Sequence, residues 1–273
     1  MTADLMTLDE MRKHEWIVTW SGGKDSTSTI LLMHEHGIPI KRIIYVQMMF
    51  DENTPATLPA MYEHVMRAKS KFESWGYSVE IIRGITTAIE MARKQYQHSK
   101  FTERNGKYYG ISAFVRGMCR FMNVKPETIR KKCHTKGEYH MIGYSADETA
   151  RIQRLGGKNQ SILVALGVTA AEAVKICRDN DLLSPIYNSK IRRDGCFFCP
   201  NAGKDERMRL RTDYPELYQR IQSLIEMSAS GYNLRHIYTR NEWVRDYLNE
   251  QNEHSKQVTL FDGFSAQKGD IMR

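Results

Sequence analysis

Near the N-terminus the chain reads Trp16-Ile17-Val18-Thr19-Trp20-Ser21-Gly22-Gly23-Lys24-Asp25-Ser26. The first five residues predict a buried strand, and the two glycines allow a tight turn before a helix that begins near Thr27. Such a turn directs unpaired backbone N–H groups, backed by the helix dipole, at one point in space, and these donors bind anions, usually phosphate. The hydroxyls of Ser21 and Ser26 and the charge of Lys24 add to this preference. The residues therefore predict a phosphate-binding loop, although the G-x-x-x-x-G-K-[ST] spacing of the Walker type is missing.

The segments that follow alternate between apolar runs and amphipathic stretches. We expect strands at 42–50, 79–82 and 139–144, and helices at 58–75, 87–97 and 168–180, the last with Thr169 as N-cap and Glu172 completing a capping box. This alternation predicts an α/β protein with a doubly wound, mainly parallel, Rossmann-like sheet, and ligands of such sheets bind at the carboxyl ends of the strands. The polar segments after Pro200 predict a helical C-terminal part. We therefore expect a nucleotide-binding domain over residues 1–200 and a helical extension over residues 201–273.

Composition and charge narrow the class of protein. Of the 273 residues, 41% are hydrophobic and 26% are charged, as in ordinary globular proteins. No apolar run approaches the length of a membrane span, and the first residues lack a signal-peptide core, so we expect a cytoplasmic protein without a membrane partner. The net charge of +8 indicates anionic partners, either nucleotide phosphates alone or a nucleic acid that docks on a basic face. The local excess of basic residues comprises Lys125, Arg130, Lys131, Lys132, Lys136, Arg192, Arg193, Lys204, Arg207, Arg209 and Arg211.

The cysteines predict a metal site. Five cysteines, an odd number, do not indicate a disulfide framework, whereas Cys196 and Cys199 form a C-x2-C pair that can bind one metal centre. With Cys119 they supply three thiolates, and Cys133 or His134 is a candidate fourth ligand. Zinc and an iron–sulfur cluster both remain open, because both use cysteines at this spacing. Cys177, in a predicted helix, is expected to be a core residue.

Several motifs together resemble a known family. Residues 21–26 match S-G-G-x-D-S, the PP-loop of the ATP pyrophosphatase superfamily, at every fixed position. In chain order, four further segments are similar to those of the PAPS-reductase family. Asp51–Thr57 resembles its D-T-G-x-E-x-P-E-T loop, and Cys119–Pro126 resembles its C-x5-K-x(n)-P segment. Gly143–Arg151 resembles its G-x-R-x-D-E-S-x-R stretch, and Gly195–Pro200, which follows Pro185-Ile186-Tyr187, resembles its G-C-x-x-C-P ending. The resemblance runs from Trp16 to about Met227 and implies an adenine nucleotide alpha hydrolase-like fold that binds ATP with Mg2+.

The departures from the family are also informative. The 51–57 segment lacks the glycine and the second Glu, and Ser145 stands where an Arg is usual. The reductases without a cluster carry a catalytic cysteine in a C-terminal tail, but this chain has no cysteine after Cys199. The cluster-bearing reductases use a Cys-Cys pair, which Met118 breaks here. The chain therefore lacks the characteristic thiols of both kinds of reductase. What remains is similar to the PP-loop sulfurtransferases that thiolate RNA bases and to the DNA phosphorothioation enzyme.

This resemblance implies a function and a set of site residues. ATP would adenylylate a substrate oxygen, releasing pyrophosphate, and sulfur carried on a [4Fe-4S] cluster would displace AMP. The implied partners are an adenine nucleotide, a nucleic-acid substrate and a sulfur or electron donor. The predicted catalytic residues are Lys24, Asp25, Glu148 and Arg151; the nucleotide-binding residues are Ser21, Gly22, Gly23, Lys24, Asp25, Ser26, Asp51 and Gly143; the metal ligands are Cys119, Cys196 and Cys199.

Other interpretations of the same residues remain open. The chain could be a PAPS or APS reductase, or a non-catalytic protein that binds nucleotide or nucleic acid and holds structural zinc. Asp25 could be only a helix N-cap, and Asp51 only a strand-terminating acid. Glu148 and Arg151 could form only an i,i+3 ion pair. The sulfur acceptor and the oligomeric state are not predicted.

Overall fold

The computed structural model describes residues 5–100, 102–133, 137–188, 195–229, 234, 237 and 240–253. The chain forms two compact units, one of Met1–Ala88 with Met122–Cys196 and one of Ile89–Phe121 with Phe197–Arg273. The predicted boundary near residue 200 lies close to the third crossing between the units, which follows Cys196. That residues 89–121 belong with the C-terminal part was not predicted. In the described part of the chain, no helix is both long and apolar enough to cross a membrane.

The first unit is built on a five-stranded sheet in the order β3-β2-β1-β4-β5. Its strands are β1 (Trp16–Trp20), β2 (Ile40–Gln47), β3 (Val79–Arg83), β4 (Tyr139–Met141) and β5 (Asn159–Gln160). All neighbouring pairs are parallel, and Val18 in β1 lies opposite Ile43 in β2 and Met141 in β4. The predicted doubly wound α/β fold is thus confirmed. The strand order reverses between β1 and β4, which is where such sheets bind their ligands.

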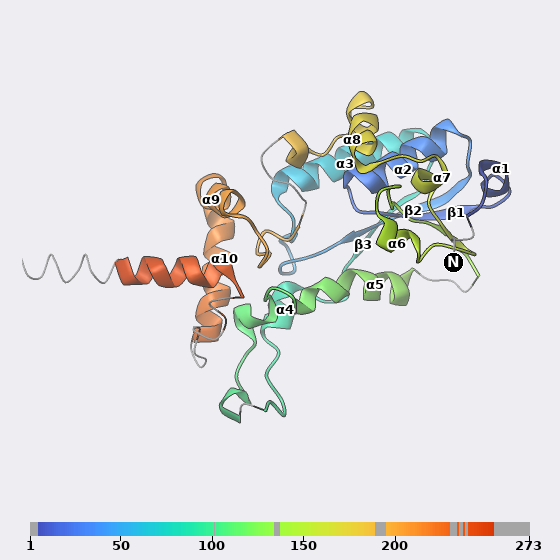
Figure 1. The fold of residues 1–273 in the computed structure, drawn as a ribbon. Helices are drawn as coiled ribbons and strands as arrows, with labels where there is room; N and C mark the ends of the chain where they lie inside the picture. Colours follow the sequence, from blue (N-terminus) through green and yellow to red (C-terminus); the bar gives the residue numbers. More distant parts are fainter. Residues whose placement is uncertain are drawn as a thin grey trace, which may run out of the picture. The chain divides into compact units, whose positions relative to one another are not determined.

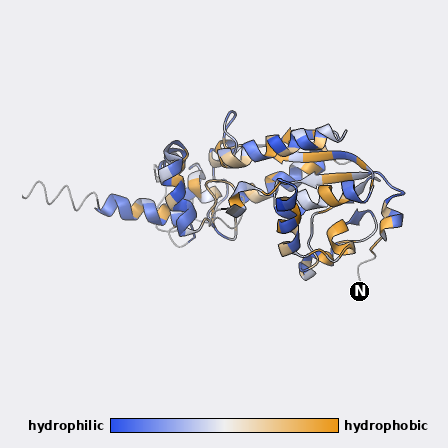
Figure 2. Ribbon diagram, turned by 90° about the horizontal axis from the view of Figure 1, so that it is seen from above, coloured by the Kyte–Doolittle hydropathy of each residue, from blue (hydrophilic) through white to orange (hydrophobic). Residues whose placement is uncertain are grey.

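Helices cover both faces of the sheet (Figure 1). On one face lie α2 (Lys24–Glu35), α3 (Pro59–Ser74), α7 (Ile162–Ala165) and α8 (Ala170–Asp179), packed over Trp16, Val18 and Trp20 of β1. On the other lies α5 (Val124–Lys132), whose Ile129 packs against Ile17 and Ile44. Alternate β1 side chains therefore enter different cores, as a strand buried on both faces requires. The strands are accordingly apolar, and appear orange between the helices in Figure 2. The shorter helices of the first unit are α1 (Leu8–Met11) and α6 (Thr149–Ile152), and α4 (Ala88–Ala92) begins at its boundary with the second unit.

The helix boundaries correct some expectations. The helix after the glycine loop begins at Lys24, three residues before the predicted start, because Gly23 is its N-cap. The helix predicted at 87–97 ends at Ala92. Helix α5 was not predicted; its Pro126 is tolerated because it lies in the first turn. The predicted capping box at the start of α8 is confirmed, since Thr169 and Glu172 each cap the other's backbone N–H.

The second unit is mainly helical in its described C-terminal part. It contains α9 (Lys204–Asp213), α10 (Pro215–Ala229) and a helix over residues 242–253. Arginines of α9 pair with acids of the last helix, with Arg207 Nε 2.7 Å from Asp246 Oδ2. The 89–121 segment packs closely against α10, because a Cβ at Gly110 would lie 2.8 Å from the backbone nitrogen of Ser228. This unit is held by buried aromatic and paired charged groups and has no sheet among its described residues.

Candidate functional site

The loop after β1 requires glycine at residue 22. Gly22 has a backbone φ of +79°, which residues with a side chain rarely adopt. A Cβ at this position would also lie 3.0 Å from Val65 Cγ2 of α3. The loop therefore turns in the space between β1 and α3. This confirms the turn that the two glycines predicted.

The two serines of the loop hold its shape. The Ser26 hydroxyl accepts a hydrogen bond from the Ser21 N–H at 3.1 Å and lies 2.9 Å from the Ser21 hydroxyl. It also lies 3.2 Å from the Gly23 carbonyl oxygen, to which it can donate. Ser26 is buried, so these bonds lie largely out of water. The predicted phosphate donors are thus first of all the groups that pre-form the loop.

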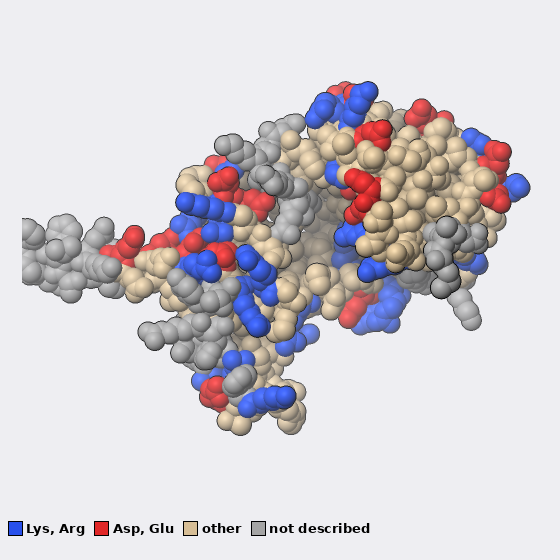
Figure 3. All heavy atoms as spheres, in the orientation of Figure 1, with Lys and Arg blue, Asp and Glu red and all other residues tan. Residues whose placement is uncertain are grey.

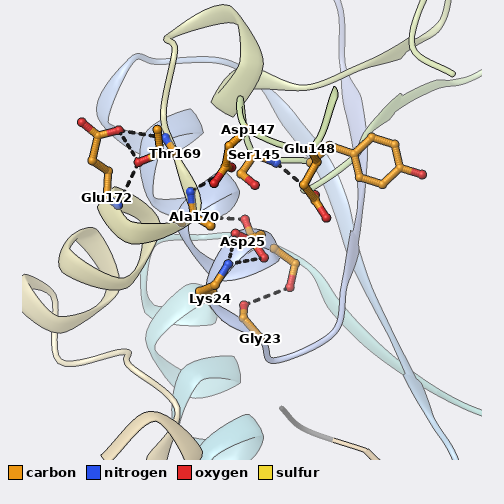
Figure 4. A network of polar contacts seen from close by, with 12 residues as sticks. Gly23, Lys24, Asp25, Ser145, Asp147, Glu148, Thr169, Ala170 and Glu172 are labelled. Atoms are coloured by element: carbon orange, nitrogen blue, oxygen red, sulfur yellow. Dashed lines mark hydrogen bonds and ion pairs between the residues drawn. The ribbon is translucent and has the colours of Figure 1, made fainter. Parts of the chain in front are cut away.

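The start of α2 is a helix N-terminus without a side-chain cap among the described residues. Its N-cap is Gly23, which makes no side-chain cap hydrogen bond, so the N–H groups of the first turn keep their binding capacity. At the nearby start of α8, by contrast, Asp147 Oδ1 accepts the Ala170 N–H at 3.1 Å (Figure 4). Asp25 lies in the first turn of α2, but its carboxylate pairs with Lys24 rather than with the backbone N–H groups. The start of α2 therefore has the N–H donors and helix dipole that an anion site needs, and its binding of phosphate stays a prediction.

Lys24 and Asp25 form an ion pair at this helix start. Lys24 Nζ lies 2.6 Å and 2.7 Å from the two carboxylate oxygens of Asp25. The alternative role of Asp25 as N-cap is wrong, because Gly23 occupies that position. The Ser145 hydroxyl, the Ala170 N–H and, more weakly, the Lys24 charge hold the pKa of Asp147 below its ordinary value. A positive charge with two nearby carboxylates can neutralise phosphate and position a cation.

The segment after β4 closes on this loop. A Cβ on Gly143 would lie 2.8 Å from the backbone nitrogen of Ser26 and 3.0 Å from the backbone carbon of Asp25. The loops that follow β1 and β4 are thus in contact at the switch point of the sheet. The absence of a side chain at Gly143 is what allows the two loops to approach so closely.

Glu148 and Arg151 pair with each other. Glu148 Oε1 lies 2.9 Å from Arg151 Nη1, and its other oxygen accepts the Ser145 N–H at 3.3 Å. The Arg151 guanidinium lies 5.7 Å from the centre of the Tyr144 ring. The i,i+3 ion pair is therefore present, and Glu148 also supports the turn at Ser145 (Figure 4). Their catalytic roles stay predictions.

Asp51 supports its own loop. Its Oδ1 accepts the N–H groups of Asn53 at 2.9 Å and Thr54 at 2.8 Å, as in an Asx turn. This local role follows from the residue type alone. The predicted contact between Asp51 and a nucleotide stays a prediction.

His64 is a site neighbour that sequence reasoning missed. It is 3% exposed, on the same helix as Val65, and its two ring nitrogens make no hydrogen bond that meets normal geometry within the described structure. Burial and, to a lesser extent, the charge of Arg67 lower its pKa to about 4, against a smaller upward effect of the Gly22 backbone. A neutral imidazole therefore lies beside the loop. No spacing in the sequence indicates this environment.

Two cysteine-bearing segments lie side by side in the second unit. The Phe198 ring, next to Cys199, lies 5.6 Å from Phe121, two residues after Cys119, and 4.9 Å from Phe114. The Trp243 indole N–H donates to the Cys199 carbonyl at 3.0 Å, and Asn241 Nδ2 donates to the Phe114 carbonyl at 2.7 Å. The start of the last helix thus holds both segments. Phe197 and Phe198 are buried, so they pack in the core.

The structure does not show a metal centre. No group of three or more His, Cys, Asp or Glu side chains with the geometry of a metal site occurs among the described residues. Ligation by Cys119, Cys196 and Cys199 therefore stays a prediction, and no chemical step is derived through a cluster. Cys177 is a core residue, as expected: it is fully buried, its thiol donates to the Lys24 carbonyl at 3.2 Å, and burial raises its pKa to about 12. Cys133 is also buried, and the candidate ligand His134 lies outside the described residues.

Comparison with known proteins gives a distant structural likeness. No protein-family model matches the sequence, and no curated protein matches it. Among solved structures, the chain is similar to the U34-tRNA thiolase NcsA from Methanococcus maripaludis with its [4Fe-4S] cluster. The similarity has a TM-score of 0.39 and 15% identity and covers 80% of this chain and 72% of that chain. A likeness at this level is a distant one of fold and assigns neither substrate nor cofactor.

Proposed function

We propose that this protein is an ATP-dependent enzyme that binds the nucleotide phosphates at the start of α2. The observation that carries the proposal is the uncapped start of α2, which follows a loop pre-formed by Ser21 and Ser26 and places Lys24 in its first turn. Glycine at residue 22 lets the chain turn, and glycine at residue 143 lets the neighbouring loop close on it. A preformed set of N–H donors costs little to organise when phosphate binds.

The proposed reaction activates an acceptor oxygen. That oxygen attacks the α-phosphorus of ATP, the bond to the β-phosphate oxygen breaks, and pyrophosphate leaves. Lys24 exchanges Asp25 for the phosphates and neutralises the leaving group, while the released Asp25 carboxylate holds Mg2+. A sulfur nucleophile supplied by a sulfide donor then attacks the activated carbon, and the C–O bond breaks to release AMP. We assign sulfur handling to Cys119, Cys196 and Cys199 because their segments are the cysteine-bearing loops of this chain.

The nucleotide half of the proposal is tested by equilibrium binding of ATP and Mg2+ and by pyrophosphate release. Asp25→Ala combined with Ser26→Ala should abolish both. A control variant, Ser70→Ala with Asp179→Ala at exposed positions, should retain both. Unchanged binding in the loop variant would show that residues 21–26 are a structural turn.

The sulfur half is tested by metal analysis. Protein purified without oxygen should contain iron and acid-labile sulfide, and Cys119→Ser, Cys196→Ser and Cys199→Ser should each lose them, whereas Cys133→Ser should not. Zinc without iron would instead favour a non-catalytic zinc protein. Binding of PAPS or APS with thioredoxin-dependent release of sulfite would favour a sulfonucleotide reductase.

A further inference from the structure

Residues 93–100 and 102–109 form a hairpin-like segment of the second unit, which we name the basic arm. Its two sides are joined by backbone hydrogen bonds from Tyr96 N–H to the Lys107 carbonyl at 3.0 Å and from Tyr109 N–H to the Lys94 carbonyl at 2.9 Å. Ser99 N–H donates to Asn105 Oδ1 at 2.8 Å near the tip. The arm follows α4 in the lower part of Figure 1. Its backbone is thus a defined scaffold for the side chains that it carries.

The basic arm has a strong excess of positive charge. Its basic residues are Arg93, Lys94, Lys100, Arg104 and Lys107, and its one acidic residue is Glu103. Arg93, Lys94, Lys100 and Lys107 are exposed. None of these four forms an ion pair with any described residue. Figure 3 shows Lys and Arg side chains on this segment, at the bottom of the view. Their charge is therefore available to an anionic partner.

The basic stretches that the sequence singled out differ in this respect. In α9, Arg207 and Arg211 pair with Asp246 at 2.7 Å and 3.5 Å. In α5, Lys131 lies 3.9 Å from Glu127, and Lys132 donates to the Arg83 carbonyl at 3.1 Å. Lys136, Arg192 and Arg193 lie outside the described residues. Several basic side chains in those stretches are therefore already paired with acidic or carbonyl groups of the fold, whereas the four exposed basic side chains of the basic arm form no ion pair with a described residue.

An aromatic ring accompanies the exposed charge. Tyr108 is 46% exposed and follows Lys107 directly. It is the one large hydrophobic side chain that is exposed in the described arm. A single ring beside a cation does not form the apolar patch that a membrane or a protein core would need. It does provide a stacking surface for an unpaired base beside a contact for the adjoining phosphate.

We propose that the basic arm binds single-stranded nucleic acid. The lysines contact phosphates, and the Tyr108 ring stacks on a base, which must be unpaired because bases in a duplex stack on one another. The Tyr109 ring at the base of the arm lies 4.5 Å from the guanidinium of Arg120, the residue after Cys119. The base of the arm therefore lies beside the segment that carries Cys119. The inference rests on the proposed function only in taking this strand as the sulfur acceptor.

The test measures binding of a fluorescent 20-nucleotide single strand of mixed sequence, as RNA and as DNA, over a range of salt. Lys94→Ala, Lys100→Ala and Lys107→Ala together should weaken binding at least tenfold. They should also reduce the slope of log Kd against log salt by about 2, since three phosphate contacts are lost. Tyr108→Ala should weaken binding about tenfold with an unchanged slope, and Tyr108→Phe should restore it.

The controls separate this inference from the nucleotide proposal. Lys13→Ala, Lys175→Ala and Arg178→Ala together remove the same charge at exposed positions of the first unit and should leave binding of the strand within about twofold of the parent. The arm variants should bind ATP normally, and the variant of Asp25 and Ser26 should still bind the strand. Equal weakening by the control set, tighter binding of duplex than of single strand, or no change in the arm variants would overturn the proposal. If the triple variant melts early, Lys100→Ala and Lys107→Ala measured singly decide.

Discussion

Gly143 approaches Ser26 so closely that a Cβ at residue 143 would lie 2.8 Å from the Ser26 backbone nitrogen. The two residues follow β4 and β1, the strands between which the sheet order reverses. The uncapped start of α2 thus has the β4 loop as one of its walls. This contact brings the loop motif at residues 21–26 against the Gly143–Arg151 segment. The sequence alone identified the two motifs separately and did not show that they touch.

We expect Gly143→Ala to damage this site. The atoms that the new Cβ meets belong to the backbone of Ser26 and Asp25 and cannot rotate away. The helix start must shift, which should raise the Kd for ATP at least tenfold and cost about 1–3 kcal/mol of the free energy of unfolding. Calorimetric titration and urea unfolding measure the two effects. Gly203→Ala is the control, since among the described residues that Cβ would meet only the Glu206 carboxylate, at 4.0 Å.

Replacing Lys24 should separate binding from stability. Lys24→Met keeps most of the side-chain stem but removes the charge that pairs with Asp25 at 2.6 Å. Because this pair is partly exposed, its loss should change the free energy of unfolding by less than about 1 kcal/mol. The Kd for ATP should rise about tenfold, and more at low salt, because a charge–phosphate contact is lost. Lys175→Met at an exposed position of α8 should alter neither value.

His64 makes stability depend on pH. Its pKa is about 4 in the folded protein, against 6.5 as its ordinary value, so the unfolded chain binds a proton first as the pH falls. Between these values the unfolded state holds more protons, so this contribution to stability is complete above pH 6.5 and is lost as the pH falls toward 4. From pH 7 to pH 5 the loss is about 2 kcal/mol. Urea unfolding at both pH values measures it.

The matched variant for this pH effect is His64→Leu, which removes the titrating group and keeps the site apolar. Its loss of stability between pH 7 and pH 5 should be smaller than that of the parent by about the same 2 kcal/mol. His98→Gln, at an exposed position, should keep the parent slope. Equal slopes in the parent and in His64→Leu would contradict the assignment.

The sequence predicted those features that depend on near neighbours in the chain. The apolar residues of β1 and the glycines of the loop define a strand and a turn, and the Thr169–Glu172 capping box lies within four residues. Each of these depends on a short pattern whose geometry allows few alternatives. By contrast, the family resemblance gave Gly143 only as a nucleotide-binding residue, and its close approach to Ser26 was not predicted.

The features that sequence reasoning missed depend on contacts distant in the chain. His64 has the pattern of a helix residue, and only its burial near Gly22 makes it unusual. The sequence suggested that the basic residues of α9 could bind an anionic partner, but Asp246 in the last helix pairs with Arg207. Residues 89–121 join the second unit by packing on α10, which no local pattern indicates. Burial and pairing of this kind arise only when the whole chain folds.

Trp243 should control access to Cys199. Its indole N–H donates to the Cys199 carbonyl at 3.0 Å, and its ring is almost fully buried. Trp243→Phe keeps an aromatic ring but loses this bond, which should cost about 1–3 kcal/mol and loosen the loop. In protein freed of metal by EDTA, iodoacetamide should then modify Cys199 about three times faster, as mass spectrometry can follow.

Cys177 is the internal control, since it is fully buried with a pKa raised to about 12 and should stay unmodified. Trp75→Phe in the first unit should leave the Cys199 rate unchanged. If Trp243→Phe leaves it unchanged as well, the last helix does not hold the cysteine loop.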